Sequence, residues 1–384
     1  MKYVVTIVLA FLMVAQCSAV ASGEETVELS IRKEGEAAIS RGLLWIMTQQ
    51  MEDGSWSSYP AITALVVSAM LRSPFDYDQY NTEAISKGLD YITGSVKPDG
   101  SIHAGNMPGY NTSVCIMALR DARDPAYDTI IGNARDFLIR LQCDEEEGYQ
   151  PDSVYYGGIG YGGDDRPDMS NMQWAMEALE ASKEYAKRSE HSMDESEGTE
   201  PETELPTSGH SQKGIFWDKA VIFLERCQNF ETNDQSWAGN DGGFVYYPGS
   251  SKAGGTTSYG SMTYAGLKSF IHANLDKEDP RVIAAYDWIR KNYTVDKNPE
   301  MGLQGLYYYY HTMAKALNIY GEENIEDDEG VKHNWREDLI IKLSSLQHEE
   351  GYWVNTNGRW WENNKSLVTA YCILALEEVL GTAR

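Results

Sequence analysis

The segment "QQMEDGSW" (residues 49–56) decides the fold, because its glutamine, glycine and tryptophan recur along the chain at fixed spacing. Residues 41–56 follow the pattern Arg-Gly-x2-Trp-Ile-x3-Gln-x3-Gly-x-Trp, and residues 87–102 follow Lys-Gly-x2-Tyr-Ile-x3-Val-x3-Gly-x-Ile. The two carboxylates of the segment, Glu52 and Asp53, are not part of the pattern that the copies share. A residue that recurs in the copies of a repeat is typical of a structural role and not of catalysis. We therefore interpret the segment as a structural contact between repeats.

Six copies of this pattern can be aligned, with anchors at positions 50, 96, 142, 228, 293 and 347. Each anchor ends an amphipathic helical run and is followed by a glycine-rich turn and a second, more apolar helical run. Hydrophobicity on most faces predicts burial on most faces, so the second helix of each pair should lie inside. The residues expected to hold the repeats together are Gln50, Gly54, Trp56, Gln142, Gln228, Gln347, Gly351 and Trp353.

Six helical hairpins in two concentric layers make an all-α (α/α)6 toroid, a double-layered barrel of twelve helices. Both terminal copies match the pattern well, which favours a closed ring over an open solenoid, since a solenoid needs polar capping repeats. The expected repeats span about 36–72, 81–120, 128–186, 214–274, 280–320 and 335–381. The acidic tract 187–213 lacks large apolar residues and is expected to be a disordered insertion.

The N-terminus has the layout of a secretory signal peptide: Lys2, an apolar run over 4–14, and small residues up to Ala21. We expect cleavage near Ala21, which leaves 22–384 as a single exported domain, periplasmic or secreted. A lipoprotein site at Cys17 is less favoured, because Gln16 precedes it. No later apolar run approaches the ~20 residues needed to cross a bilayer, so no transmembrane anchor is expected.

The chain carries a net charge of -26, which argues against nucleic acid as a partner. Peripheral contact with a membrane is left open. The four cysteines after the expected cleavage site are too scattered for a paired metal-binding motif, and no metal or cofactor is expected. Cys143 and Cys227 end equivalent helices, and the sequence leaves open whether they form a disulfide.

The Gln-x3-Gly-x-Trp repeat resembles that of the squalene and oxidosqualene cyclases and, more loosely, that of the protein prenyltransferase β-subunits. The strings "GGFVYYPGSSKAGGTTSYGSMTYAGL" (242–267) and "GLYYYYHTMAKAL" (305–317) are similar to exported bacterial proteins with prenyltransferase/squalene oxidase repeats. The resemblance covers residues 36–381. It implies a terpenoid cyclase/prenyltransferase-like toroid whose inner helices line a central cavity.

The catalytic motifs that this resemblance would bring are missing. Class II cyclases use an Asp-x-Asp-Asp acid, and this chain offers only Asp164-Asp165 and Asp327-Asp328, both in polar, turn-like contexts. The string "DDRPD" (164–168) matches a magnesium-binding pattern, but its proline favours the start of a helix. The prenyltransferase zinc site would need an Asp and a Cys besides His311, and "TSYGSMTYAGL" supplies Ser and Met there. Catalytic residues are therefore not assigned.

The residues that could line a central cavity lie where the inner helices begin and where the copies differ. Aromatic side chains predominate among them, and such rings suit an apolar ligand, for which a polyisoprenoid is one example, as well as sugar rings. A cavity larger than ~300 Å³ would support ligand binding. The candidates are Asp168, Asn171, Trp174, Tyr259, Thr263, Tyr308, His311, Trp360, Trp361 and Glu362.

Three functions remain open from the sequence. The leading hypothesis is a squalene-cyclase/prenyltransferase-like protein that binds an apolar ligand in the aromatic cavity. The second is a carbohydrate-active (α/α)6 hydrolase or lyase, which would need paired carboxylates such as Asp168 or Glu362 facing a groove. The third is a non-enzymatic interaction scaffold that uses the rim of the ring and the acidic insertion.

Overall fold

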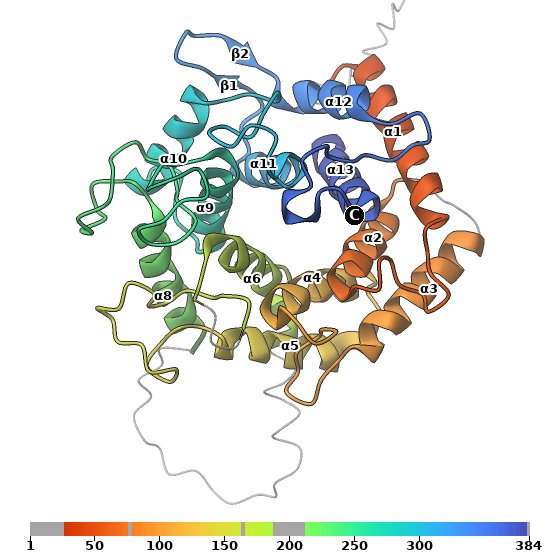
Figure 1. Ribbon diagram of the computed structural model, residues 1–384, viewed down its shortest axis with the longest axis horizontal. Coiled ribbons are helices and arrows are strands. Elements are labelled where there is room, and N and C mark those ends of the chain that lie inside the picture. Colours follow the sequence, from red (N-terminus) through yellow and green to blue (C-terminus); the bar gives the residue numbers. More distant parts are fainter. Residues whose placement is uncertain (1–26, 76–78, 163–165, 187–211, 382–384) are drawn as a thin grey trace, which may run out of the picture.

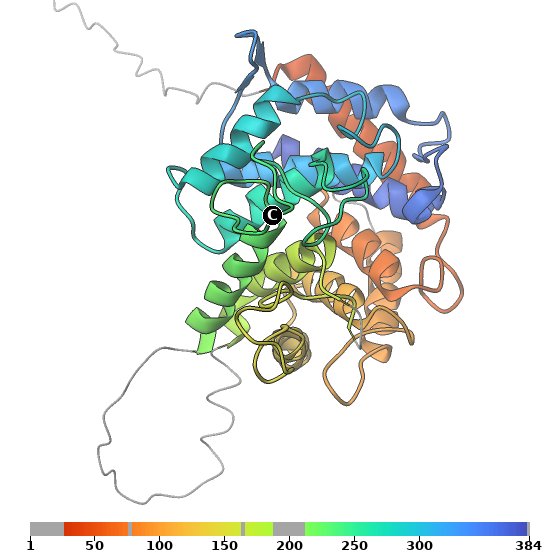
Figure 2. The same cartoon turned by 60° about the vertical axis from the view of Figure 1, so that its left-hand side comes forward.

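The structure is a computed structural model that describes residues 27–75, 79–162, 166–186 and 212–381. The described residues form twelve α-helices arranged as two concentric rings, so the chain is an α/α toroid (Figure 1). Figure 2 shows the same helices turned by 60°. The outer helices are α1 (Leu29–Met47), α3 (Gln79–Gly94), α5 (Asp128–Arg140), α8 (Gln212–Cys227), α10 (Pro280–Lys291) and α12 (Trp335–Leu346). The inner helices are α2 (Pro60–Arg72), α4 (Pro108–Asp121), α6 (Met169–Ala181), α9 (Gly260–His272), α11 (Leu306–Tyr320) and α13 (Lys365–Leu380).

The inner helices are those with apolar residues on most faces, as the pattern predicted. In α13, 14 of the 16 residues are buried. In the outer helix α5 only 6 of the 13 residues are buried, on the face that contacts the inner layer. The layer that each helix occupies therefore follows from how much of its circumference is hydrophobic.

The ring is closed. The inner helices pack in the order α2, α4, α6, α9, α11 and α13, and α13 then packs against α2. Helix α1 also packs against α12 and α13, so the first and last hairpins are neighbours. The open solenoid that the sequence left as an alternative is therefore wrong.

The four repeated glutamines each join one hairpin to the next. The side-chain amide of Gln50 donates hydrogen bonds to the carbonyl of Gly54 in its own turn (2.9 Å) and to that of Ala84 in α3 (2.8 Å). Because a buried carbonyl without a partner is costly, one amide stabilises the turn and the junction together. The same pair of bonds recurs from Gln142 to Gly157 and Phe216, from Gln228 to Gly242 and Arg281, and from Gln347 to Gly351 and Ala38.

Gly54 and Trp56 complete this junction. A Cβ atom on Gly54, whose φ is +84°, would lie 2.4 Å from the carbonyl oxygen of Lys87 in α3, so the turn is pressed directly against the next outer helix. Trp56 is fully buried and its indole donates a hydrogen bond to the Ile46 carbonyl (2.8 Å). Trp353 makes the equivalent bond to Leu343 (2.8 Å).

Some details differ from the expectations. Helix α1 begins at Leu29, before the expected start of the first repeat at 36, and α8 begins at Gln212, inside the expected end of the insertion. A short hairpin of β1 (Ile325–Glu326) and β2 (Lys332–His333) was not predicted. Three 3-10 turns complete the elements: η1 (Pro125–Tyr127), η2 (Lys183–Tyr185) and η3 (Arg359–Trp361).

Several expectations fall on parts of the chain that lie outside the described residues, namely the signal peptide, Cys17, Asp164-Asp165 and most of the insertion. Within the described residues, no helix is both long and apolar enough to span a membrane. Cys143 and Cys227 are buried free thiols, as are Cys115 and Cys372.

Candidate functional site

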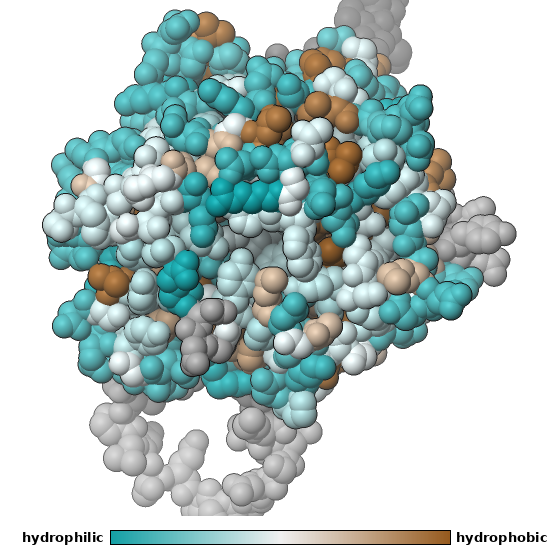
Figure 3. All heavy atoms as spheres, viewed as in Figure 1, coloured by the Kyte–Doolittle hydropathy of each residue, from teal (hydrophilic) through white to brown (hydrophobic). Residues whose placement is uncertain are grey.

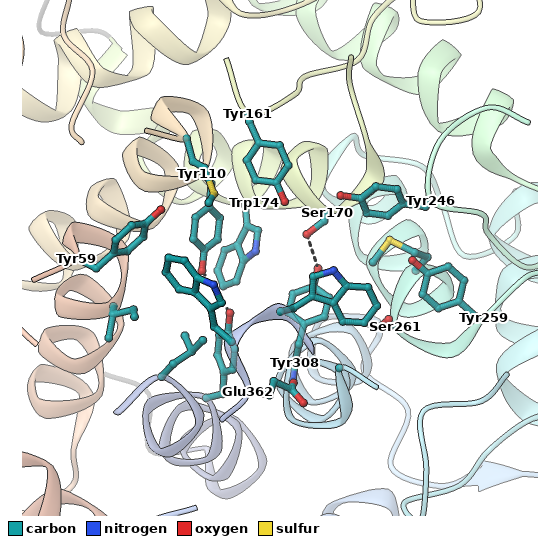
Figure 4. A pocket seen from close by; sticks show the side chains of 18 residues that line it. Tyr59, Tyr110, Tyr161, Ser170, Trp174, Tyr246, Tyr259, Ser261, Tyr308 and Glu362 are labelled. Atoms are coloured by element: carbon teal, nitrogen blue, oxygen red, sulfur yellow. Dashed lines mark hydrogen bonds between the residues drawn. The ribbon is translucent and has the colours of Figure 1, made fainter. Parts of the chain in front are cut away.

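A pocket of about 220 Å³ lies at the centre of the ring, where the inner helices begin. Figure 3, viewed along the axis of the ring, shows the hollow at the centre of this face. Ten of the eighteen described residues that line the pocket are aromatic, and Figure 4 shows side chains from several inner helices converging on one space. The lining residues are Tyr59, Ile62, Met107, Tyr110, Tyr161, Ser170, Trp174, Tyr246, Tyr259, Ser261, Met262, Gly305, Tyr308, Trp360, Trp361, Glu362, Leu367 and Tyr371.

The pocket sits at the N-terminal ends of the inner helices because every hairpin runs in the same direction. Tyr59 and Tyr259 each directly precede an inner helix, α2 and α9. Asn111 accepts a hydrogen bond from the Ala61 amide (3.0 Å) and so holds the start of α2 from the next repeat. Asn298 does the same for α9, accepting from Ser261 (3.0 Å). At these two places an asparagine side chain of one repeat holds the start of an inner helix of the preceding repeat, and the Asn111 amide also donates to the hydroxyl of Tyr59 in the pocket lining (3.2 Å).

Glu362 is the only carboxyl among the described lining residues. Its side chain is 1 % exposed; one oxygen accepts the backbone N–H of Tyr308 at the start of α11 (2.8 Å), and the other accepts the Asn355 amide (2.6 Å). Burial raises the pKa of Glu362 to about 7, although these hydrogen bonds act in the opposite direction. The group therefore titrates near neutral pH, and both of its forms are accessible under ordinary conditions.

Trp360 and Trp361 form the exposed part of the mouth, with 43 % and 48 % of their surface accessible. Both adopt left-handed backbone conformations, with φ of 55° and 65°, which are uncommon and costly for large side chains. Trp361 packs edge-on against Tyr59 (ring centroids 5.2 Å apart), and the Arg359 guanidinium lies 4.3 Å from the centre of the Trp360 ring. The surrounding contacts therefore hold two large rings at the opening in spite of the backbone strain.

The phenol hydroxyls deeper in the pocket are already paired. The hydroxyls of Tyr110 and Tyr371 are 3.3 Å apart, and that of Tyr308 accepts the Gln173 amide (3.2 Å) and lies 3.4 Å from Ser170. What these side chains offer to a ligand is therefore mainly the faces of their rings (Figure 4).

Six of the ten cavity candidates from the sequence line the pocket: Trp174, Tyr259, Tyr308, Trp360, Trp361 and Glu362. The other four are not among the described lining residues. Thr263 is used inside the fourth repeat, where its hydroxyl accepts the Phe244 amide (3.1 Å). His311 lies behind Trp174, with the two rings stacked 5.3 Å apart, and neither imidazole nitrogen has a hydrogen-bond partner among the described residues.

Asp168 and Asn171 start helix α6. One oxygen of the Asp168 carboxylate accepts the Asn171 backbone amide (2.9 Å) and the other accepts its side-chain amide (2.8 Å), which is the geometry of a helix N-cap. Burial raises the pKa of Asp168 to about 6. This agrees with the interpretation of "DDRPD" as the start of a helix. The N-cap, however, is Asp168, and Pro167 lies just before the helix and not at its first position.

The sequence missed several tyrosines of the pocket. Tyr59 precedes α2 and Tyr110 lies in the first turn of α4, the same places relative to an inner helix as Tyr259 and Tyr308. A comparison of equivalent positions at the starts of the expected inner helices would have identified both tyrosines. Tyr161 and Tyr246 come from long turns whose path only the structure gives.

The opposite end of the inner ring carries buried charge. Glu177 of α6 accepts hydrogen bonds from both Lys268 of α9 and Lys315 of α11, and all three side chains are more than nine-tenths buried. Arg72 of α2 pairs with Glu378 of α13 nearby in the ring. Burial opposes the charged form of Glu177, but the two lysines hold its pKa well below its usual value.

The arrangement argues against a two-carboxylate glycosidase site, because only Glu362 of the expected pair faces the pocket and Asp168 is committed to the start of α6. No group of three or more His, Cys, Asp or Glu side chains within the described part of the chain could hold a metal ion. Asp327 lies on the β1–β2 hairpin and pairs with His333 (2.9 Å), away from an apolar pocket.

Comparison with known proteins supports the fold. No family model matches the sequence, and no curated protein matches it. Among solved structures, a variant of the type II terpene cyclase MstE from Scytonema in complex with geranylgeranyl dihydroxybenzoate is similar, with a TM-score of 0.54 and 13% identity over 93% of this chain and 100% of that one. A second, apo variant of that cyclase has a TM-score of 0.54 and 12% identity, over 93% of this chain and 100% of that one.

A possible member of the GH105 family from Salmonella enterica serovar Paratyphi A has the same TM-score of 0.54, with 9% identity over 91% of this chain and 94% of that one. At these identities the likeness shows the toroid fold alone.

Proposed function

We propose that the protein binds a compact apolar ligand of the isoprenoid class in the aromatic pocket. The observation that carries this proposal is the lining itself, in which ten aromatic rings surround a space open at Trp360 and Trp361. Burying an apolar ligand against such rings is favourable by roughly 25 cal/mol per Å² of apolar surface removed from water. The terpene cyclase of similar fold holds a prenylated substrate, which agrees with this ligand class.

The size of the pocket limits the ligand. The volume of about 220 Å³ is smaller than the ~300 Å³ above which a cavity would support ligand binding, and smaller than the usual pocket for a drug-sized ligand. We therefore propose a short isoprenoid, or one end of a longer chain whose remainder leaves through the mouth. The exposed faces of Trp360 and Trp361 would contact that remainder.

Intrinsic tryptophan fluorescence tests this proposal, because Trp174, Trp360 and Trp361 all line the pocket. Titration with geraniol should quench and saturate, and should raise the unfolding temperature by mass action. The variant Trp174→Ala should lose the affinity, whereas Trp217→Ala, outside the pocket, should keep it. Absence of saturable binding and of any thermal shift with geraniol and longer prenols would contradict the proposal.

A carbohydrate ligand is the second candidate, because aromatic faces also bind sugar rings and a GH105-like structure shares the toroid. Glu362, with its raised pKa, would be the acid of such a site. A sugar needs several hydrogen-bonding partners, however, and the hydroxyls of Tyr110, Tyr308 and Tyr371 already have partners. Hydrolysis of unsaturated oligosaccharides by the wild type, lost in Glu362→Gln, would favour this candidate over the isoprenoid.

We also propose that the protein is exported, because residues 1–21 have the layout of a signal peptide. N-terminal sequencing of the protein recovered from its own host should give a chain that starts at Ser22. Recovery of the intact N-terminus from the cytoplasm would contradict export, and a lipid on Cys17 would favour the lipoprotein alternative.

A further inference from the structure

The pocket combines ten aromatic rings with one carboxyl group, and none of the described residues that line it is a lysine, arginine or histidine. We propose that it binds an organic cation: an apolar ligand with a quaternary ammonium group that lies among the rings, with Glu362 as its counter-charge. The inference rests on the proposed function, since it needs the same pocket to admit a ligand. It adds the charge that the ligand carries.

Aromatic faces attract cations because the ring quadrupole places negative charge above the ring, and each such contact contributes about 0.5–2 kcal/mol. A quaternary ammonium group suits this pocket better than a primary amine, because it has no N–H donors that need acceptors. The hydroxyls of Tyr110, Tyr308 and Tyr371 already have partners, which leaves mainly ring faces for the ligand. A neutral ligand of the same shape would gain the burial but not the electrostatic attraction.

Rings of this pocket already interact with cations of the chain. The ammonium of Lys252 lies 4.2 Å from the centre of the Tyr246 ring, and the Arg359 guanidinium lies 4.3 Å from that of Trp360. Lys268 and Lys315 lie 5.7 and 5.5 Å from the centre of the Trp174 ring. None of these four lines the pocket, so the ring surfaces that face it are left for a ligand.

The charges around the pocket act in both directions. The four basic groups oppose a further cation, but Lys268 and Lys315 share Glu177 as a buried partner. Glu362 borders the pocket directly, and a charge in contact outweighs more distant ones. At longer range the net charge of -26 concentrates cations near the protein.

The proposal makes binding depend on pH through Glu362. Only the ionised carboxylate attracts the cation, so affinity should rise as pH increases through about 7. Tyr307, Tyr371 and Cys372 interact electrostatically with Glu362, and burial raises the pKa of each above its ordinary value, so these three groups stay neutral in this range. Asp168, whose pKa is raised to about 6, caps α6 outside the pocket lining and is tested separately as Asp168→Asn.

Isothermal titration with choline and with 3,3-dimethylbutan-1-ol, its neutral isostere of the same shape, tests the proposal. At about pH 8.5 choline should bind at least ~10-fold more tightly, since one cation–π contact and one ion pair exceed the 1.4 kcal/mol that a factor of ten requires. At about pH 5.5 the preference should shrink several-fold, because Glu362 is then protonated. Equal affinity for the two compounds at about pH 8.5 would overturn the proposal.

Two variants separate the charge from the rings. Glu362→Gln should remove most of the preference for choline and its pH dependence while the isostere binds as before; Glu350→Gln, which removes an exposed carboxyl from a neighbouring turn, should change neither. If Glu362→Gln fails to fold, Trp360→Leu gives a second readout, because it removes one ring face at an exposed position. A choline preference unchanged in Trp360→Leu and, where it folds, in Glu362→Gln would overturn the proposal.

Parallel titration with geraniol distinguishes failure of the cation proposal from failure of the proposed apolar pocket. Saturable binding of geraniol without a preference for choline over its isostere would overturn the cation and leave the proposed apolar pocket intact. Failure of geraniol, choline and the isostere to bind would overturn both. Binding of choline in preference to its isostere, with or without geraniol, supports the cation.

Discussion

Each repeated glutamine has one function, which is to bind two carbonyls on either side of a junction between hairpins. In Gln50→Ala the carbonyls of Gly54 and Ala84 lose their donor, and water has limited access to them. We expect a loss of about 2 kcal/mol in the free energy of unfolding, since two hydrogen bonds are removed and their partners are left behind. Urea unfolding followed by circular dichroism measures it.

The chain supplies its own control beside this residue. Gln49 is exposed, and its amide contacts only the hydroxyl of Thr48 among the hydrogen bonds described. Gln49→Ala should change the urea midpoint by little more than the measurement error. Equal losses in the two variants would mean that helix propensity at the end of α1, and not the junction, sets the effect.

Glu362 should make the protein less stable as pH rises from about 4.5 to about 7. Its pKa is about 7 in the folded protein against an ordinary 4.5, so its contribution is fully present below pH 4.5 and is lost as pH rises through 7. A shift of this size corresponds to about 3 kcal/mol. Unfolding temperatures of wild type and Glu362→Gln at about pH 5 and 7.5 should show a smaller decrease in the variant; equal decreases would contradict the assignment.

Two glycines in turns allow the cost of a positive φ to be distinguished from the cost of a clash between an added Cβ atom and a neighbouring helix. Gly148 and Gly157 have nearly the same φ, 83° and 85°. A Cβ atom on Gly148 meets nothing within 4 Å, whereas one on Gly157 would lie 1.8 Å from the Lys219 carbonyl oxygen in α8. Gly148→Ala should therefore cost about 1 kcal/mol in unfolding free energy.

Gly157→Ala should cost several kcal/mol more, because α8 has to move away from the turn and the Gln142 hydrogen bonds with it. Thermal unfolding of the two variants, measured side by side, gives the difference. A Gly157→Ala protein as stable as Gly148→Ala would show that the turn and α8 are not pressed together.

The order and layer of the helices could be predicted from the sequence because they depend on features that recur. An inner helix such as α13 is apolar on nearly all faces, and its partner α12 ends at the glutamine anchor. The β1–β2 hairpin could not be predicted, because it occurs once and its strands have two residues each.

The candidate site could be predicted only in part. Trp360 and Glu362 stand out because they lie shortly before an inner helix and have no counterpart in the other copies. Thr263 and His311 also lie in an inner helix, but which side of a fully buried helix faces the axis depends on packing angles that the pattern does not contain. Tyr161 and Tyr246 reach the pocket from long turns, whose path is likewise set by tertiary contacts.

For the whole molecule, the buried cluster of Glu177, Lys268 and Lys315 joins three successive inner helices. Glu177→Gln leaves two buried ammonium groups without a counter-charge, which should cost about 3–5 kcal/mol. Glu180→Gln, one turn further along α6 at a side chain that is 27% exposed, should cost less than about 1 kcal/mol. Urea unfolding near neutral pH checks both; similar losses would contradict a special role for the cluster.

The junction between the last and first hairpins is built like those at Gln50, Gln142 and Gln228: Gln347 binds the carbonyls of Gly351 and Ala38. Arg32 adds a hydrogen bond to the Leu380 carbonyl (3.3 Å). The contacts at the junction between the last and first hairpins therefore do not distinguish it from a junction inside the chain. A circular permutant that joins Gly381 to Leu29 through a short linker and begins instead between α4 and α5, at residue 123, should fold to the same toroid. The junctions at Gln50, Gln142 and Gln228, which have the same pair of bonds, should hold the ring together in the permutant as they do in the wild type.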